Sequence, residues 1–310
     1  MSKSSRRRAR AKTRKQTQRR GVPVRAVAAP VATKTQPRSR PVSKAVPVEP
    51  AGPAAADAVH AVVWRSGLLN VTAIARRELG ALFVSPIGWV VAGAFTFLVS
   101  GFGFIGTVLA GQQATMEGVS NIITGLLSLI LIPVLTMRLI AEERSQGTLE
   151  LLLTSPVRDW ELAVGKWLGA FTFYVLLLAT TLVYVVLLAI YVPDKSALDF
   201  GLIAATYIGM LLVGASSVAI GVLASALTKN QIIAYVVTLF GLLAIWYTAF
   251  LIGFFTTPPL SLFFDYVAGY YRYQPFSLGQ VTLRDTVYFA SLAVGALFLT
   301  TRLLESRRWR

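Results

Sequence analysis

The sequence has no cysteine and a single histidine, His60. The lack of cysteine excludes disulfide bonds, thiolate metal sites and thiol nucleophiles. One histidine is too few for a His/Cys metal cluster, and its position near the N-terminal region excludes a Ser-His-Asp hydrolase site within the apolar remainder of the chain. We therefore expect neither a metal nor a cofactor in this chain.

A phosphate-binding loop is also missing. The pattern G-x-x-x-x-G-K-[ST] occurs nowhere, and Gly165-Lys166 does not follow a glycine-rich loop. The chain is therefore not expected to be an enzyme, and any ATP hydrolysis would have to come from another chain.

Charge is scarce outside the N-terminal region. Residues 1–50 contain 15 Lys or Arg and one acid, Glu49, which accounts for +14 of the net charge of +16. No aromatic residue precedes Trp64, and such a segment buries too little apolar area to offset its ordering entropy. We predict a disordered basic tail over residues 1–60. Contact with anionic lipid and a transit peptide are the alternatives, whereas nucleic-acid binding is not expected because no aromatics interleave the charges.

Hydrophobic residues are abundant, at 55% of the chain with a mean hydropathy of +0.63. Several apolar runs exceed the ~18 residues that mark a spanning helix. The sequence predicts an all-α polytopic membrane protein, with a transmembrane domain over residues 61–310. Six transmembrane helices are expected at about residues 88–110, 119–137, 167–191, 201–228, 231–254 and 283–304.

The segment before the first predicted span has helical, amphipathic spacing. Arg76, Arg77 and Glu78 are expected on its polar side, and Ser85-Pro86 is expected to end it, because a residue before proline avoids the helical region. The run is too polar to span, so we predict an interfacial helix over residues 67–84. Its apolar side is expected to comprise Leu68, Val71, Ile74, Leu79, Leu82 and Phe83.

The distribution of basic residues predicts the orientation. Six spans place both termini on one side, and with that side taken as cytoplasmic, twelve Lys or Arg beyond residue 60 fall there. The outer loops hold three, namely Lys195, Arg272 and Arg284. Because cytoplasmic loops are enriched in Lys and Arg, both termini and the loop after the second span are predicted to be cytoplasmic.

That loop, Leu135–Val157, concentrates charge between two apolar stretches. We expect Arg138 to Arg144 to continue the second span, Gly147 to permit a bend, and Thr148–Thr154 to form a short helix. Asp159 is expected to cap the following helix, with Glu161 in its first turn. The pattern indicates a docking surface for a soluble partner, although spacing alone is equally compatible with an ordinary connector.

The loop between the fifth and sixth predicted spans is rich in aromatics. Nine fall from Phe254 to Phe276, in a stretch that contains the helix break at Pro258-Pro259. Aromatic residues prefer the headgroup depth of a membrane, so an interfacial anchor is one interpretation. A short outer helix that caps an exit path is the other.

Two stretches carry a resemblance to a known family. TMRLIAEERSQGTLELLLTSPV, followed by Gly165-Lys166, resembles the cytoplasmic signature of type-2 ABC exporter permeases, most closely the gliding-motility-type subfamily. ARRELGALFVSPIGWVVAGAF, from Ala75 to Phe95, is similar to that subfamily's entry into its first span. The likeness covers about residues 70–305.

The resemblance implies a permease subunit of a prokaryotic plasma-membrane transporter that exports its substrate by alternating access. A second permease copy or paralogue and separate ABC ATPase subunits, which bind ATP and Mg, would be its partners in the lipid membrane. Arg76, Arg77 and Glu78 would belong to the connecting helix. The resemblance places the ATPase-docking residues of the coupling helix at Glu142, Glu143, Arg144, Gly147, Thr148 and Glu150.

Three other functional classes compete with a permease. Ion-coupled secondary transporters usually carry ionisable groups within the bilayer, whereas Glu117 and Asp285 fall at the outer edges of the predicted spans. A nontransporting scaffold, whose tail and loop recruit partners, is compatible with the composition. An intramembrane enzyme is the least favoured, because the predicted spans lack histidine, cysteine and paired acids.

Overall fold

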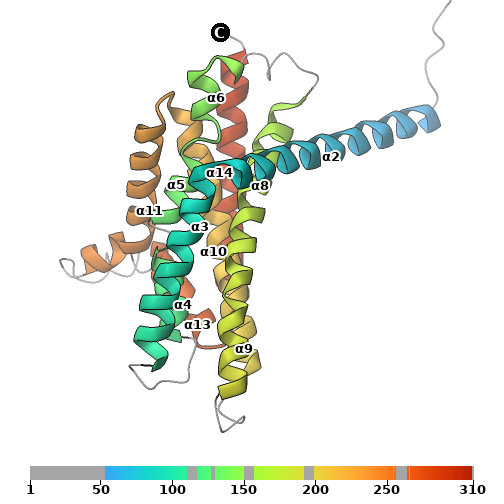
Figure 1. The fold of residues 1–310 in the computed structure, drawn as a ribbon. Coiled ribbons are helices and arrows are strands. Elements are labelled where there is room, and N and C mark those ends of the chain that lie inside the picture. The colour runs from blue at the N-terminus through green and yellow to red at the C-terminus, as the bar shows by residue number, and fades with distance from the viewer. Residues whose placement is uncertain are drawn as a thin grey trace, which may run out of the picture. The chain divides into compact units, whose positions relative to one another are not determined.

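The computed structural model describes residues 53–109, 117–126, 130–149, 157–191, 199–253, 255, 264 and 266–308. These residues are helical apart from turns and short connections, and none of them forms a strand. This confirms the all-α class over the described ranges (Figure 1). The helices are α2 (Pro53–Val84), α3 (Pro86–Leu98), the π-helix η1 (Val99–Leu109), α4 (Glu117–Leu126), α5 (Ile132–Thr136), α6 (Ala141–Ser145), α8 (Asp159–Thr180), α9 (Leu182–Tyr191), α10 (Phe200–Leu227), α11 (Gln231–Gly253), α13 (Gly269–Ser277) and α14 (Leu283–Arg308).

The long helix α2 contains the predicted interfacial segment as its C-terminal part. It begins at Pro53, inside the stretch predicted as a tail, where an alanine-rich run favours helix. Residues 1–52, the rest of that predicted tail, lie outside the described residues. The expected break is confirmed, since Ser85 Oγ accepts a hydrogen bond from Ile87 N at 3.3 Å and caps α3.

The apolar positions predicted for the 67–84 segment divide between exposed and buried environments. Leu68 and Phe83 are 64% and 43% exposed, whereas Val71 and Leu82 are buried. The buried side is set by where α8 crosses α2, and periodicity does not encode that crossing. Whether the helix lies at a membrane interface stays a prediction.

Four described helices are long and apolar enough to cross a membrane: Pro86–Ile105, Asp159–Ile190, Phe200–Leu227 and Leu283–Arg307. They correspond to the first, third, fourth and sixth predicted spans. The fifth is represented by the shorter apolar stretch Gln231–Tyr247 of α11. The second contains α4 and α5, with residues 127–129 outside the described ranges. A total of six spans therefore stays a prediction.

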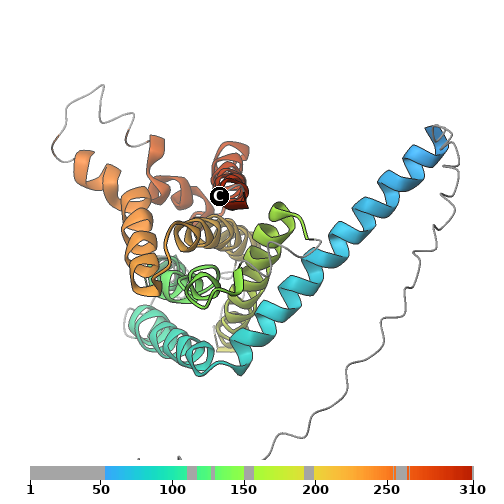
Figure 2. The same ribbon diagram turned by 90° about the horizontal axis from the view of Figure 1, so that it is seen from above.

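Helix α10 lies at the centre of the bundle. In Figure 2 it is surrounded by α14, α8, α5 and α11, and its apolar window is the most buried of the four candidate spans. Its sequence is rich in Gly, Ala and Ser, and small residues allow helices to approach closely. The fourth and fifth predicted spans form a helical hairpin, because α10 ends at Leu227, α11 begins at Gln231 and the two helices pack together.

The two ends of the bundle differ. Helix α6, the start of α8 and the C-terminal end of α14 lie at one end, and α13 lies toward the other (Figure 1). A short helix, one of the two interpretations of the aromatic loop, is present as α13, whereas an outer position and a role at an exit path stay predictions. It is fastened to α14 by Arg272 Nη1, which donates to Asp285 Oδ1 at 3.1 Å.

Candidate functional site

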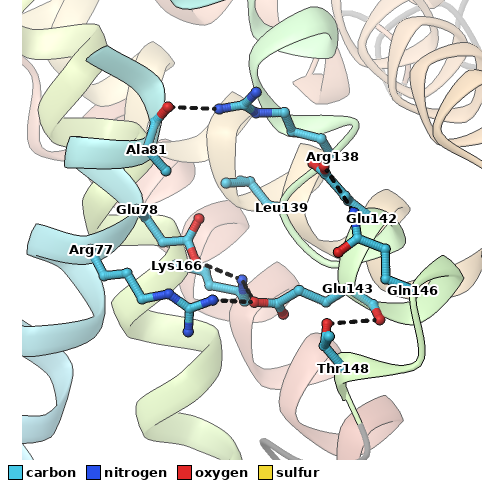
Figure 3. Close-up of a pocket in the computed structure, with 10 residues that line it drawn as sticks. All are labelled: Arg77, Glu78, Ala81, Arg138, Leu139, Glu142, Glu143, Gln146, Thr148 and Lys166. Atoms are coloured by element: carbon cyan, nitrogen blue, oxygen red, sulfur yellow. Dashed lines mark hydrogen bonds and ion pairs between the residues drawn. The ribbon is translucent and has the colours of Figure 1, made fainter. Parts of the chain in front are cut away.

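Helices α2, α6 and α8 enclose a charged cavity of about 320 Å³. Figure 3 shows acidic and basic side chains from all three helices pointing toward one another. The cavity is lined by Arg77, Glu78, Ala81, Arg138, Leu139, Glu142, Glu143, Gln146, Thr148 and Lys166.

Helices α2 and α8 pack closely because α8 carries glycines where α2 crosses it. A Cβ on Gly165 would lie 2.8 Å from Ile74 Cβ, and one on Gly169 would lie 2.7 Å from Glu78 Cβ. Any larger residue would hold the two helices apart. Their close approach brings the Glu78 carboxylate to Lys166 on α8.

Asn70 and Glu161 fasten the same pair of helices one turn further along. Asn70 Nδ2 donates to Glu161 Oε2 at 3.0 Å. The same carboxylate oxygen accepts from Arg158 N at 3.2 Å. The expected cap is therefore wrong, because Arg158 is the N-cap and Asp159 is already the first residue of α8. Glu161 in the first turn is confirmed, and its carboxylate satisfies the free amide of the cap.

Lys166 joins the three helices of the cavity. Its Nζ lies 2.9 Å from Glu78 Oε1 on α2 and 2.9 Å from Glu143 Oε1 on α6. Arg77 Nη2 lies 3.5 Å from the same oxygen of Glu143. The Lys166 side chain is 1% exposed, so its charge is compensated by these two carboxylates rather than by water. Removing one partner of such a buried pair leaves an uncompensated charge and costs about 3–5 kcal/mol.

Glu143 is the acid of the cavity whose pKa is raised. Burial raises the pKa of its carboxyl and neighbouring Glu78 adds to the rise, whereas Lys166 and Arg77 act to lower that pKa. Its second oxygen, Oε2, is buried and has no hydrogen-bond partner among the described residues. An unpaired buried acceptor of this kind carries a desolvation cost.

The backbone around α6 is shaped by a break and a bend. The expected continuation of the second span through Arg138–Arg144 is wrong, because α5 ends at Thr136 and a turn over Met137–Ile140 precedes α6. The amides that begin α6 donate to the Ser225 hydroxyl of α10, which replaces helical carbonyls as their acceptor. The predicted bend is confirmed, as Gly147 has φ +74°, a conformation that favours glycine.

The structure brings most of the sequence-predicted residues together. Arg77, Glu78, Glu142, Glu143 and Thr148 line the cavity, and Thr148 Oγ1 donates to Glu143 O at 3.2 Å.

The other predicted residues lie elsewhere. Arg76 is exposed and does not line the cavity. Arg144 Nη1 donates to Leu227 O on α10 at 3.3 Å. Gly147 forms the bend, and Glu150, with the rest of the predicted Thr148–Thr154 helix beyond Leu149, lies outside the described residues.

Two charged residues of the cavity were not among the predicted site residues. Lys166 holds the site together, and the signal for it was a lysine at the beginning of a long apolar run. Arg138 donates to Ser85 Oγ at 2.8 Å and to Ala81 O at 3.3 Å, so it ties the end of α2 to the turn after α5. The two hydrogen bonds of Arg138 are not visible in the sequence, because Ser85 and Ala81 lie 53 and 57 positions away from it.

Comparison with known proteins gives a family match and a local relative. Residues 107–301 match the family described as "ABC-2 family transporter protein". Over 103 residues the chain is 33% identical to "Probable multidrug ABC transporter permease YbhR" of Escherichia coli. That alignment covers 33% of this chain and 26% of the relative, so the chain spans about a quarter of the relative's length.

Proposed function

This chain belongs to the ABC-2 transporter family, and we propose that it is the permease subunit of an ATP-driven exporter. Separate ATPase subunits, which bind ATP and Mg, dock on the surface formed by α2, α6 and the residues after Gly147. The full assembly contains a second permease, either another copy or a paralogue. Within the family, the signature around Glu142 and Glu143 favours the gliding-motility-type subfamily.

The observation that carries this proposal is the position of Lys166. It joins Glu78, from the proposed connecting helix, to Glu143, from the proposed coupling segment, at 2.9 Å each. A load applied to α6 therefore reaches α2 and the start of α8 through one buried charge cluster. A connector that only links two spans does not need such a cluster, because buried ion pairs add little net stability.

The direction of transport and the membrane topology belong to the same proposal. Six spans cross a prokaryotic plasma membrane, with both termini and α6 in the cytosol and α2 lying at the interface. Closure of the ATPases on ATP pushes α6, and the permease alternates between inward-open and outward-open states. Helix α13, at the other end of the bundle, caps the exit.

An ion-coupled mechanism is disfavoured by where the charges lie. Among the four candidate spans, the charged residues fall toward the ends. Asp159, Glu161 and Lys166 lie near the start of one, and Arg284, Asp285, Arg302, Glu305 and Arg307 lie near the ends of another. Coupling ions are usually bound by ionisable groups deeper in the bilayer.

Charge reversal at the docking surface tests the proposal. Glu142→Lys together with Glu143→Lys should abolish capture of the ATPase subunit that copurifies with the wild-type chain, while the permease still inserts. Because Glu143 pairs with Lys166, the single variant Glu142→Lys is needed as well. Glu142 is only partly buried and accepts a weak bond from Gln146 Nε2 at 3.4 Å, so its loss leaves the buried cluster intact.

Glu305→Lys is the matched control. Glu305 is an acid at the same end of the bundle, paired with Arg302 at 2.7 Å but not part of the cavity. We expect capture to fall at least tenfold for Glu142→Lys and to stay unchanged for Glu305→Lys. Equal capture by all variants would refute docking at this surface.

A further inference from the structure

The last turn of α10 holds the segment that contains α6. Ser225 Oγ accepts hydrogen bonds from Ile140 N and Ala141 N, both at 3.0 Å, and donates to Met137 O at 3.2 Å. Ser225 is fully buried. A hydroxyl has one donor and two acceptor positions, so this serine uses its whole hydrogen-bonding capacity on the turn before α6.

Two arginines add to this attachment. Arg144 Nη1, from α6, donates to Leu227 O at 3.3 Å, and Arg307 Nη2, from α14, donates to Ala226 O at 2.8 Å. The last carbonyls of a helix lack partners within the helix, and cations near them are favourable. Residues 225–227, which we call the α10 end, thus bind both α6 and α14.

The covalent route from α6 to α5 passes through a turn, whereas the lateral route to α10 is direct. Helix α5 has only five residues, and the turn over Met137–Ile140 separates it from α6. We expect this turn to transmit less of a displacement of α6 to α5 than a continuous helix would. The bonds to the α10 end cross directly to the central helix, and α10 packs more extensively against α14 than against any other described helix.

We propose that Ser225 is a positioning residue that makes α10, and not the sequence-adjacent α5, the first membrane helix to move when α6 is pushed. This inference rests on the proposed docking of an ATPase at α6. Ser225 itself touches neither the partner nor the substrate. It acts by holding α6 in a fixed position relative to α10.

A distance measurement on the permease tests this directly. The chain has no cysteine, so spin labels can be attached at Ser145→Cys, at the end of α6 and outside the cavity lining, and Lys229→Cys, just beyond α10; both residues are exposed. We expect one narrow distance distribution in the otherwise native protein. Ser225→Ala should broaden it at least twofold, because the turn then loses three hydrogen bonds to α10.

Ser216→Ala is the matched control. Ser216 is also buried on α10, but its hydroxyl donates to Val213 O of the same helix, so it fastens no other element. We expect the control to leave the distribution unchanged. A Ser225→Ala distribution as narrow as that of the control would overturn the proposal.

The assembled complex provides the second readout. With the copurifying ATPase and ATP, the distance between the two labels should stay constant in the native background, since α6 and α10 move together. In Ser225→Ala it should shift while ATP hydrolysis stays within about twofold. If ATP shifted the distance between the labels as much in the native background as in Ser225→Ala, the proposal would also be refuted. Failure of docking is recognised separately, because the unlabelled native permease then captures no ATPase.

Discussion

At the scale of single residues, Asp285 shows how burial decides the strength of an ion pair. Its Oδ1 lies 3.1 Å from Arg272 Nη1 and 3.3 Å from Arg284 Nε, so the two distances are nearly equal. The Arg272 side chain is 5% exposed and that of Arg284 is 64% exposed. Arg272 also donates twice to Tyr266 O, each time at 2.9 Å. The buried arginine therefore fastens the segment around α13 to α14, and the exposed one does not.

Replacement of each arginine by glutamine should separate the two effects. Arg272→Gln leaves Asp285 with only the exposed arginine as a counter-charge and should lower the free energy of unfolding by about 3 kcal/mol. Arg284→Gln should change it by less than about 1 kcal/mol, because exposed pairs are screened by water. Thermal unfolding of the purified protein in detergent measures both. Similar losses of unfolding free energy in the two variants would contradict the conclusion that the buried arginine, and not the exposed one, holds the segment around α13 to α14.

At the scale of elements, the packing of α2 on α8 depends on glycine. The Gly169 Cα faces α2 so closely that an added Cβ would lie 2.7 Å from Glu78 Cβ and 2.9 Å from Ala75 O. The second of these atoms belongs to the backbone and cannot rotate away. The glycine is therefore what allows Glu78 to reach Lys166.

Gly169→Ala should move α2 away from α8. Overpacking of this kind costs about 1–3 kcal/mol, and the variant should also capture less ATPase because the Glu78–Lys166 contact is stretched. Gly80→Ala is the control, since Gly80 lies on α2 with nothing within 4 Å of its added Cβ. It should be neutral or stabilise the helix by up to about 1 kcal/mol. Equal unfolding midpoints for the two variants would rule out the tight crossing.

At the scale of the whole molecule, the bundle is divided into two functional ends. The charged cavity and the α10 end lie with α6, and α13 lies toward the opposite end. If α6 receives the ATPase in the cytosol, the loop between α13 and α14 must face the outside. The uneven distribution of Lys and Arg predicts the same orientation.

Thiol labelling on intact cells tests this two-sidedness. Gln146→Cys, after α6, and Gln280→Cys, between α13 and α14, place one exposed thiol near each end in a chain that has no other. A membrane-impermeant maleimide should modify Gln280→Cys at once and Gln146→Cys only after permeabilisation. The reverse pattern, or equal labelling of both, would invalidate the proposed topology.

The sequence by itself determined the helical membrane class and several of the places where the chain bends or a helix ends. The break at Ser85-Pro86, the hairpin around Lys229-Asn230 and the bend at Gly147 were all predictable. Each depends on the preference of one or two residues for a backbone conformation, and such preferences are local. The family signature around Glu142 and Glu143 could be read in the same way, because its residues are contiguous.

Only the tertiary structure decided which of these residues act together. Lys166 lies 88 positions from Glu78, and Ser225 lies 85 from Ile140, so no periodicity links them. The same limit explains the incorrect expectation of a helix continuing through Arg138–Arg144, since the acceptor that ends it belongs to α10. Local propensity specifies where a helix can form, whereas the buried partners of Lys166 and Ser225 are set by the packing of helices far apart in the chain.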